Sequence, residues 1–203
     1  MSVGDDRFQR TIGAIDGANE GDPNRLVVRG EDRPKALGEA ELATEWLRHL
    51  RADPGEELLL ATRAHHVRRW EVPRSTYPDG RAGYLRWRRE LHDRHAAVVA
   101  DILSQEGYDA GTVERVQDIV RKRNLARDAD VQTFEDALCL VFLETQFAEL
   151  SRRLDDDKMV DVLRKTLVKM SDDGKAAALS LTLAPDEADL LQQALATTSP
   201  SGG

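Results

Sequence analysis

Several features are scarce in this chain, and each scarcity excludes a class of protein. The 203 residues include one cysteine, Cys139, so no internal disulfide is possible and a reducing compartment is expected. No apolar run approaches the roughly 18 residues of a membrane span. The first residues lack the basic and then apolar pattern of a secretory signal. We therefore expect a cytoplasmic protein with no membrane partner.

An excess of positive charge is also lacking, because the formal net charge is −8 and the pI is near 5.2. This balance argues against binding to duplex nucleic acid, which requires many phosphates to be neutralised. One segment departs from this acidic charge balance. Residues 63–95 hold nine arginines against four acids, four of the five histidines and two of the three tryptophans. A local basic pocket in an acidic protein is expected there.

Apolar residues recur at helical spacing along most of the chain, which predicts an all-α fold. Residues 21–34 are rich in turn-forming residues and are expected to hold at most one short extended piece, and two prolines and two glycines predict a loop over 71–83. Beyond a first helix around Phe8–Ile15, the expected helices cover 39–50, 56–70, 84–106, a stretch around 113–120, 128–150, 155–174 and 185–196. We expect one helical bundle domain over 1–196 and a disordered tail over 197–203.

Histidines and acids at apolar positions are the first candidates for chemistry. His66 follows Leu59 and Arg63 on one face of the expected helix over 56–70, and His95 falls in an apolar row of the helix over 84–106. Asp136 opens the most apolar helix, where an ionised carboxylate is costly unless it is paired with a cation or a metal. Imidazoles and carboxylates together are common ligands of divalent manganese, iron and zinc. His66, His95 and Asp136 are therefore the predicted metal ligands.

The arginines and aromatic residues of the same segment indicate an anion site. Arginine presents a rigid fork that matches phosphate or carboxylate, and aromatic rings can stack on a flat ligand. The candidate ligand-binding residues are Arg63, Arg69, Arg74, Tyr77, Arg81, Tyr84, Trp87 and Arg88. Glu135, beside the predicted metal, and Lys122, as a further cation, are the candidate catalytic residues. We expect a small anionic, phosphorylated ligand, and no oligomeric state is predicted.

Long stretches of the chain resemble the family known as Domain of unknown function 4202. The resemblance is carried by "RFQRTIGAIDGANEGDP", "RAHHVRRWEVPRSTYPDGRAGYLRWRRELHDRHA", "QTFEDALCLVFLE" and "KTLVKMSDDGKAAAL". The arrangement is also distantly similar to the HD superfamily of helical, metal-dependent phosphohydrolases. That similarity implies an HD-like bundle in which His66 matches the first histidine and Asp136 the last aspartate. The middle element is either the literal His92–Asp93 pair or His95.

Three functions are compatible with these residues. The first is a metal-dependent phosphohydrolase-like enzyme acting on a small phosphorylated or nucleotide-like anion. The second is a non-catalytic module that captures an anion or an RNA end through the arginine–aromatic loop. The third is a structural protein in which the arginines, histidines and acids form a buried ion network.

Overall fold

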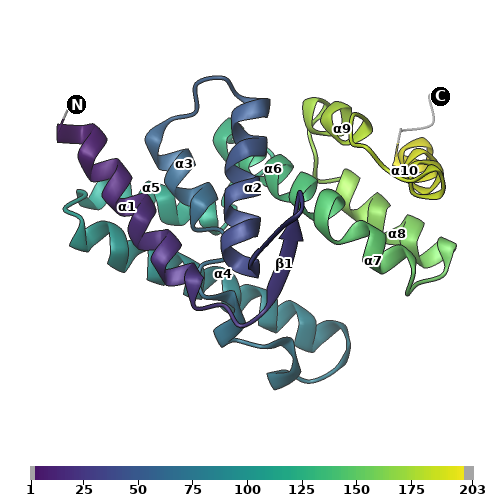
Figure 1. Ribbon diagram of the computed structural model, residues 1–203, viewed down its shortest axis with the longest axis horizontal. Coiled ribbons are helices and arrows are strands. Elements are labelled where there is room, and N and C mark those ends of the chain that lie inside the picture. The colour runs from purple at the N-terminus through teal and green to yellow at the C-terminus, as the bar shows by residue number, and fades with distance from the viewer. Residues whose placement is uncertain (1–2, 199–203) are drawn as a thin grey trace.

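The chain folds into helices with one short hairpin. The structure is a computed structural model and describes residues 3–198 (Figure 1). Its α-helices are α1 (Val3–Glu20), α2 (Lys35–Leu50), α3 (Glu56–Arg63), α4 (Gly80–Gln105), α5 (Ala110–Val120), α6 (Ala129–Thr145), α7 (Phe147–Ser151), α8 (Asp156–Leu167), α9 (Asp172–Leu179) and α10 (Pro185–Thr198). Two 3-10 turns, Arg69–Glu71 and Arg74–Thr76, lie between α3 and α4. The expected all-α class is confirmed.

The core has two main apolar clusters that share α6. One cluster gathers side chains of α1 to α6, and the other gathers α6 with α7 to α10. Figure 1 shows the corresponding arrangement, with α1, α3 and α5 on one side of α2 and with α8, α9 and α10 on the other. Trp46 and Leu50 of α2 pack against both clusters. The strongly apolar composition of α6 is explained by this position, because both of its faces are covered.

The segment between α1 and α2 forms a hairpin rather than one extended piece. Strands β1 (Arg25–Val28) and β2 (Glu31–Pro34) pair antiparallel, with Val28 opposite Glu31. Arg29 and Gly30 form the turn, and both have positive φ, 50° and 88°. A two-residue turn with positive φ at both positions matches the twist of paired strands. The hairpin packs on the amino-terminal half of α2.

The largest departure from the expected helices is the early end of α3. The expected helix over 56–70 ends at Arg63, and turns follow until Arg68, whose φ is 52°. Asn19 of α1 holds this backbone, because its Oδ1 accepts a hydrogen bond from the Arg68 amide at 3.2 Å. The single helical face predicted for Arg63 and His66 therefore does not exist. The break leaves backbone carbonyls of this segment free to accept other donors.

Two of the expected carboxyl-terminal helices are each divided in two, and the last one is longer than expected. The stretch 128–150 divides into α6 and α7, and the stretch 155–174 divides at Ser171, which caps α9 through a hydrogen bond from the Gly174 amide to its Oγ. Helix α10 continues to Thr198, so it includes the first two residues of the expected tail, and residues 199–203 lie outside the described part of the chain. Within that part, no helix is both long and apolar enough to cross a membrane.

Candidate active site

Four of the five histidines line one cavity of about 140 Å³. His92 and His95 come from α4, whose helical spacing places Tyr84, Trp87 and Arg88 along the same side. His65 and His66 come from the turns after α3. The ring centres of His65 and His66 are 4.1 Å apart, and those of His66 and His95 are 5.9 Å apart.

Each of three imidazoles donates one ring N–H to a fixed oxygen. His65 Nδ1 lies 2.9 Å from the Thr62 carbonyl, and His95 Nδ1 lies 2.8 Å from the Val67 carbonyl. His66 Nδ1 lies 2.8 Å from Oε2 of Glu39. Carbonyl and carboxylate oxygens only accept hydrogen bonds, so Nδ1 carries the proton in each ring. In the neutral imidazole, Nε2 is then left with its lone pair, which is the form that binds a metal.

Burial keeps these rings neutral. His65 and His95 are 4% and 1% exposed. Desolvation lowers the pKa of His65 and of His66 well below the ordinary value, with like charges nearby as a further cause. It lowers the pKa of His95 to about 3 and that of His92 to about 4. The Nε2 atom of His95 is buried and has no hydrogen-bond partner among the described residues. A buried nitrogen without a partner is costly, and a ligand in the cavity would satisfy it.

Fixed cations share the cavity with the imidazoles. Arg69 lies with its guanidinium 4.8 Å from the centre of the Trp87 ring and donates a long hydrogen bond, 3.4 Å, to Nε2 of His66. The Trp87 ring is itself held by a hydrogen bond from its Nε1 to the Val72 carbonyl. Arg88 and Lys122 also line the cavity. Positive charge therefore converges on the imidazole edges that carry lone pairs.

Lys122 reaches the cavity from a strained backbone position. It follows the end of α5 with φ 58°, a conformation that costs a residue with a Cβ about 1–2 kcal/mol. Its ammonium pairs with Glu135, which also pairs with Lys169 at 3.1 Å. Burial acts to raise the pKa of Glu135, but the two lysines outweigh it and the pKa is lowered. Glu135 is thus an ionised anchor between two lysines, and the trio keeps one net positive charge.

One group of side chains beside the cavity could hold a metal ion. One ligand atom each from Glu39, His65 and His66 lies within 4.8 Å of the others, and among the described residues no such group includes His95. Because a metal–nitrogen bond is about 2.1 Å, two imidazoles on one ion have ring centres at most about 6.5 Å apart. The separations from His66 to His65 and to His95 both satisfy this limit. Glu39 is 2% exposed, and its Oε1 accepts a hydrogen bond from Gln146, so it is placed to orient His66.

Asp136 does not join this cluster. Its carboxylate accepts hydrogen bonds from the Ser171 amide at 2.9 Å, from the Ser171 hydroxyl at 2.6 Å and from Gln132 Nε2 at 3.1 Å. These partners tie α6 to the start of α9, and Asp136 lines neither the cavity nor the groove that continues it. The structure brings the predicted ligands His66 and His95 together, but it turns Asp136 toward α9.

The predicted ligand-binding residues separate into two groups. Arg69, Tyr84, Trp87 and Arg88 line the cavity. The other four do not.

Of these four, Arg63 forms a two-pronged ion pair with Asp16 of α1, at 2.5 and 2.7 Å. Arg74 donates to the carbonyls of Tyr77 and Pro78 and so braces the loop before α4. Arg81 is exposed, and Tyr77, which is half-buried, also lies outside the cavity.

Sequence reasoning missed His65 and Glu39. A continuous helix over 56–70 would have pointed His65 away from His66, and only the break after Arg63 brings the two rings together. Glu39 lies 27 residues before His66 and has no motif around it. Its available signal was a carboxylate among buried positions of α2, where Ala36, Ala40 and Ala43 are also buried.

The fold and the cavity define an all-α protein with a cluster of buried and half-buried imidazoles in a cavity that three cations also line. The chain belongs to the family described as Domain of unknown function (DUF4202), whose model matches residues 9–191. The match spans every residue of the cavity. No curated protein and no solved structure matches the chain. The similarity to the HD superfamily stays a prediction.

Proposed function

We propose that this protein is a metal-dependent hydrolase of a small phosphorylated molecule. The observation that supports the proposal best is the orientation of His65, His66 and His95. Each ring has its Nδ1–H fixed by an oxygen, and all three line one cavity together with Arg69 and Lys122. Oriented imidazoles suit a metal, and fixed cations suit a phosphate.

The side chains divide the work as follows. A divalent ion bound by the imidazoles would polarise a phosphoryl oxygen and lower the pKa of a bound water. Glu39 holds His66 through Nδ1 and thereby fixes the direction of Nε2. Arg69 contacts that Nε2 in the present arrangement and would instead donate to a phosphate oxygen. Arg69, Arg88 and Lys122, the three cations that line the cavity, would neutralise the charge that develops on the phosphoryl oxygens.

The excess of cations favours a second candidate, a module that binds an anion without a metal. Arg69, Arg88 and Lys122 all line the cavity, and without an anion they repel a metal ion. In this function the imidazoles would accept hydrogen bonds from the ligand. Affinity for inorganic phosphate would then be unchanged by a chelator, and no phosphate ester would be cleaved.

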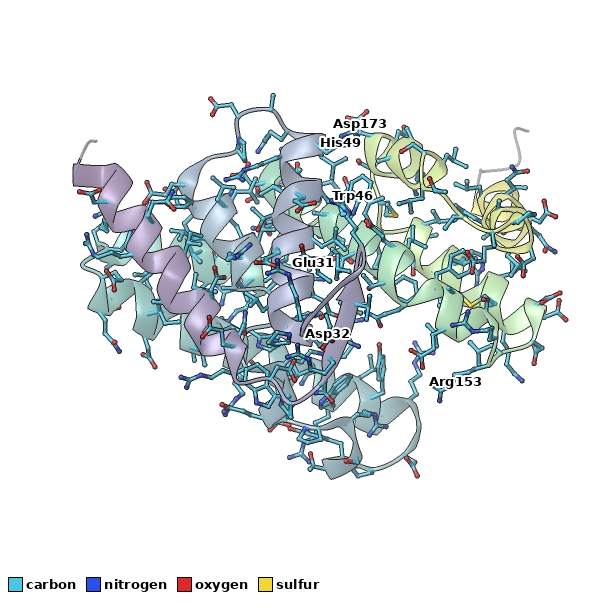
Figure 2. The ribbon with its side chains drawn as sticks, in the orientation of Figure 1. Glu31, Asp32, Trp46, His49, Arg153 and Asp173 are labelled. Atoms are coloured by element: carbon cyan, nitrogen blue, oxygen red, sulfur yellow. The ribbon has the colours of Figure 1, made fainter. Side chains whose placement is uncertain are left out.

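The test is release of phosphate from a panel of phosphate esters by the full-length protein, assayed with manganese, iron or zinc and again after chelation. The proposal expects release that depends on metal and is lost by at least about a hundredfold in His66→Ala. His49→Ala is the matched control, because His49 is exposed and lies ten residues beyond Glu39 on α2, about 15 Å along the helix. Figure 2 shows His49 at the end of α2 away from Asp32 of the hairpin. Absence of release with every metal would refute hydrolysis.

A further inference from the structure

The cavity continues into a wider groove of about 450 Å³. The two spaces share Arg69, Arg88 and Lys122 among their lining residues. Small-molecule sites range from about 300 to 1,000 Å³. The inner cavity is smaller than this range and suits a single phosphoryl group, whereas the groove has room for a larger body. The two volumes together indicate a ligand with a small charged end and an extended remainder.

Four apolar side chains form a wall of the groove. Leu138, Val141 and Phe142 of α6 line it together with Val162 of α8. Phe142 and Val162 are only half-buried, although both pack beside the carboxyl-terminal cluster. Covering such surface with an apolar group would stabilise a complex by about 25 cal/mol for each Å² removed from water. The wall therefore fits a flat or apolar group.

Two more lysines, Lys165 and Lys169, line the groove but not the inner cavity. Across the whole groove, five cations face two acids, in a chain whose net charge is −8. Lys165 pairs with Asp161 on the exposed side of α8, and Lys169 shares Glu135 with Lys122. Lys169 therefore lies near Lys122 of the inner cavity, and Lys165 is the groove lysine that shares no acid with a cation of that cavity.

We infer that the ligand is a phosphate ester whose apolar or aromatic body carries a second acidic group. The phosphate lies at the histidines, the body lies on the wall formed by Phe142 and Val162, and the second acid lies at Lys165, three residues after Val162 on α8. The position of the phosphate rests on the proposed function. The body and the second acid are assigned from the groove itself, so they can be tested without any reaction.

The test uses three probes that cannot be hydrolysed as esters: inorganic phosphate, benzylphosphonate, and benzylphosphonate with a propionate chain para to the phosphonate. Their dissociation constants are measured by calorimetry on the full-length protein, as purified and after chelation. We expect the ring to improve affinity at least about tenfold over phosphate and the propionate to add about threefold more.

Two matched pairs of variants locate the effect. Lys165→Gln should remove the gain from the propionate, whereas Lys158→Gln should not. Lys158 is also an exposed lysine of α8 paired with an aspartate, Asp155, but it lies outside the groove. Val162→Trp should remove the gain from the ring by filling the wall. Val168→Trp should keep it, because Val168 is 65% exposed and does not line the groove.

The outcomes separate the two proposals. Equal affinity for all three probes, or equal behaviour of Lys165→Gln and Lys158→Gln, would overturn the inferred ligand. Melting temperatures show whether Val162→Trp folds, and the exposed Lys165 variant decides the question if it does not. If the expected ranking is found and no phosphate ester is cleaved with any metal, the hydrolase proposal fails while the assigned groove stands.

Discussion

Replacement of Asp136 by alanine should destabilise the fold and leave metal binding intact. Asp136 is 3% exposed, and its carboxylate accepts three hydrogen bonds that join α6 to Ser171 at the start of α9. Gln132 has a second acceptor, the Lys169 carbonyl at 2.9 Å, so it keeps a partner in the variant. The amide and the hydroxyl of Ser171 lose theirs.

The size of this destabilisation follows from the two hydrogen-bond donors of Ser171 that lose their acceptor. A buried donor that loses its acceptor costs about 1–3 kcal/mol, and Ser171 is half-buried, so each of its two donors should cost about 1.5 kcal/mol and Asp136→Ala should lower the free energy of unfolding by about 3 kcal/mol. In a chain of this length, each kcal/mol shifts the melting temperature by about 2–4 °C. A decrease of about 9 °C is therefore expected.

Thermal unfolding followed by circular dichroism measures this shift, and Asp172→Ala is the matched control. Asp172 begins α9 next to Ser171, but its side chain is fully exposed and pairs only with Lys175. The control should change the melting temperature by no more than about 2 °C. If Asp136→Ala instead melted like the control and lost its metal, Asp136 would be a ligand and the present assignment would be wrong.

Two further predictions concern packing and pH. A Cβ at Gly174 would lie 2.7 Å from the Asp136 carboxyl carbon, so Gly174→Ala should lower the free energy of unfolding in urea by about 2 kcal/mol. At Gly17 in α1, a Cβ would meet no other part of the described structure within 4 Å beyond its own stretch of helix, so Gly17→Ala should raise the free energy of unfolding by about 0.5–1 kcal/mol. A hydrogen bond from Arg115 is the main cause that lowers the pKa of Asp128 from 3.8 to about 2, so this carboxylate stabilises the fold above about pH 4, and the contribution is lost as the pH falls toward 2. Both partners of the pair are partly exposed, and Asp128→Ala should accordingly cost about 1–2 kcal/mol at pH 7 and less at pH 3. Asp109→Ala, which removes a helix cap without an arginine partner, should show a weaker dependence on pH.

The fold was predictable where a helix depends on its own apolar spacing. The helices expected over 39–50 and 84–106 are present; each begins four residues earlier than expected, at Lys35 and Gly80, and ends within one residue of the expected position. The end of α3 at Arg63 was not predictable in this way, because it depends on Asn19, which holds the Arg68 amide from a helix about fifty residues earlier. The hairpin had a local signal, the dipeptide Arg29–Gly30 between two short strands. The prolines and acidic residues around it indicated a loop more strongly than this dipeptide indicated a turn between paired strands.

The site was predictable in composition and not in detail. Imidazoles and arginines are concentrated in one segment of an acidic chain, and His66, His95 and Arg69 of that segment line one cavity, while their roles stay predictions. His65 and Glu39 join them only in the folded chain. The turns after α3 place the His65 ring beside that of His66, and α2 places the Glu39 carboxylate against His66 Nδ1. Asp136 shows the limit of arguing from burial, because a buried acid is satisfied equally well by hydrogen bonds as by a metal.

We propose that the imidazoles of His65, His66 and His95 together hold a metal ion. Metal content per chain, measured by mass spectrometry after expression with supplemented manganese, iron and zinc, tests it most directly. We expect about one ion per chain in the wild type and in His49→Ala, and a loss of most of it in His66→Ala and His95→Ala. A wild-type protein without bound metal, or one whose metal survives both cavity substitutions, would show that these imidazoles are not the ligands.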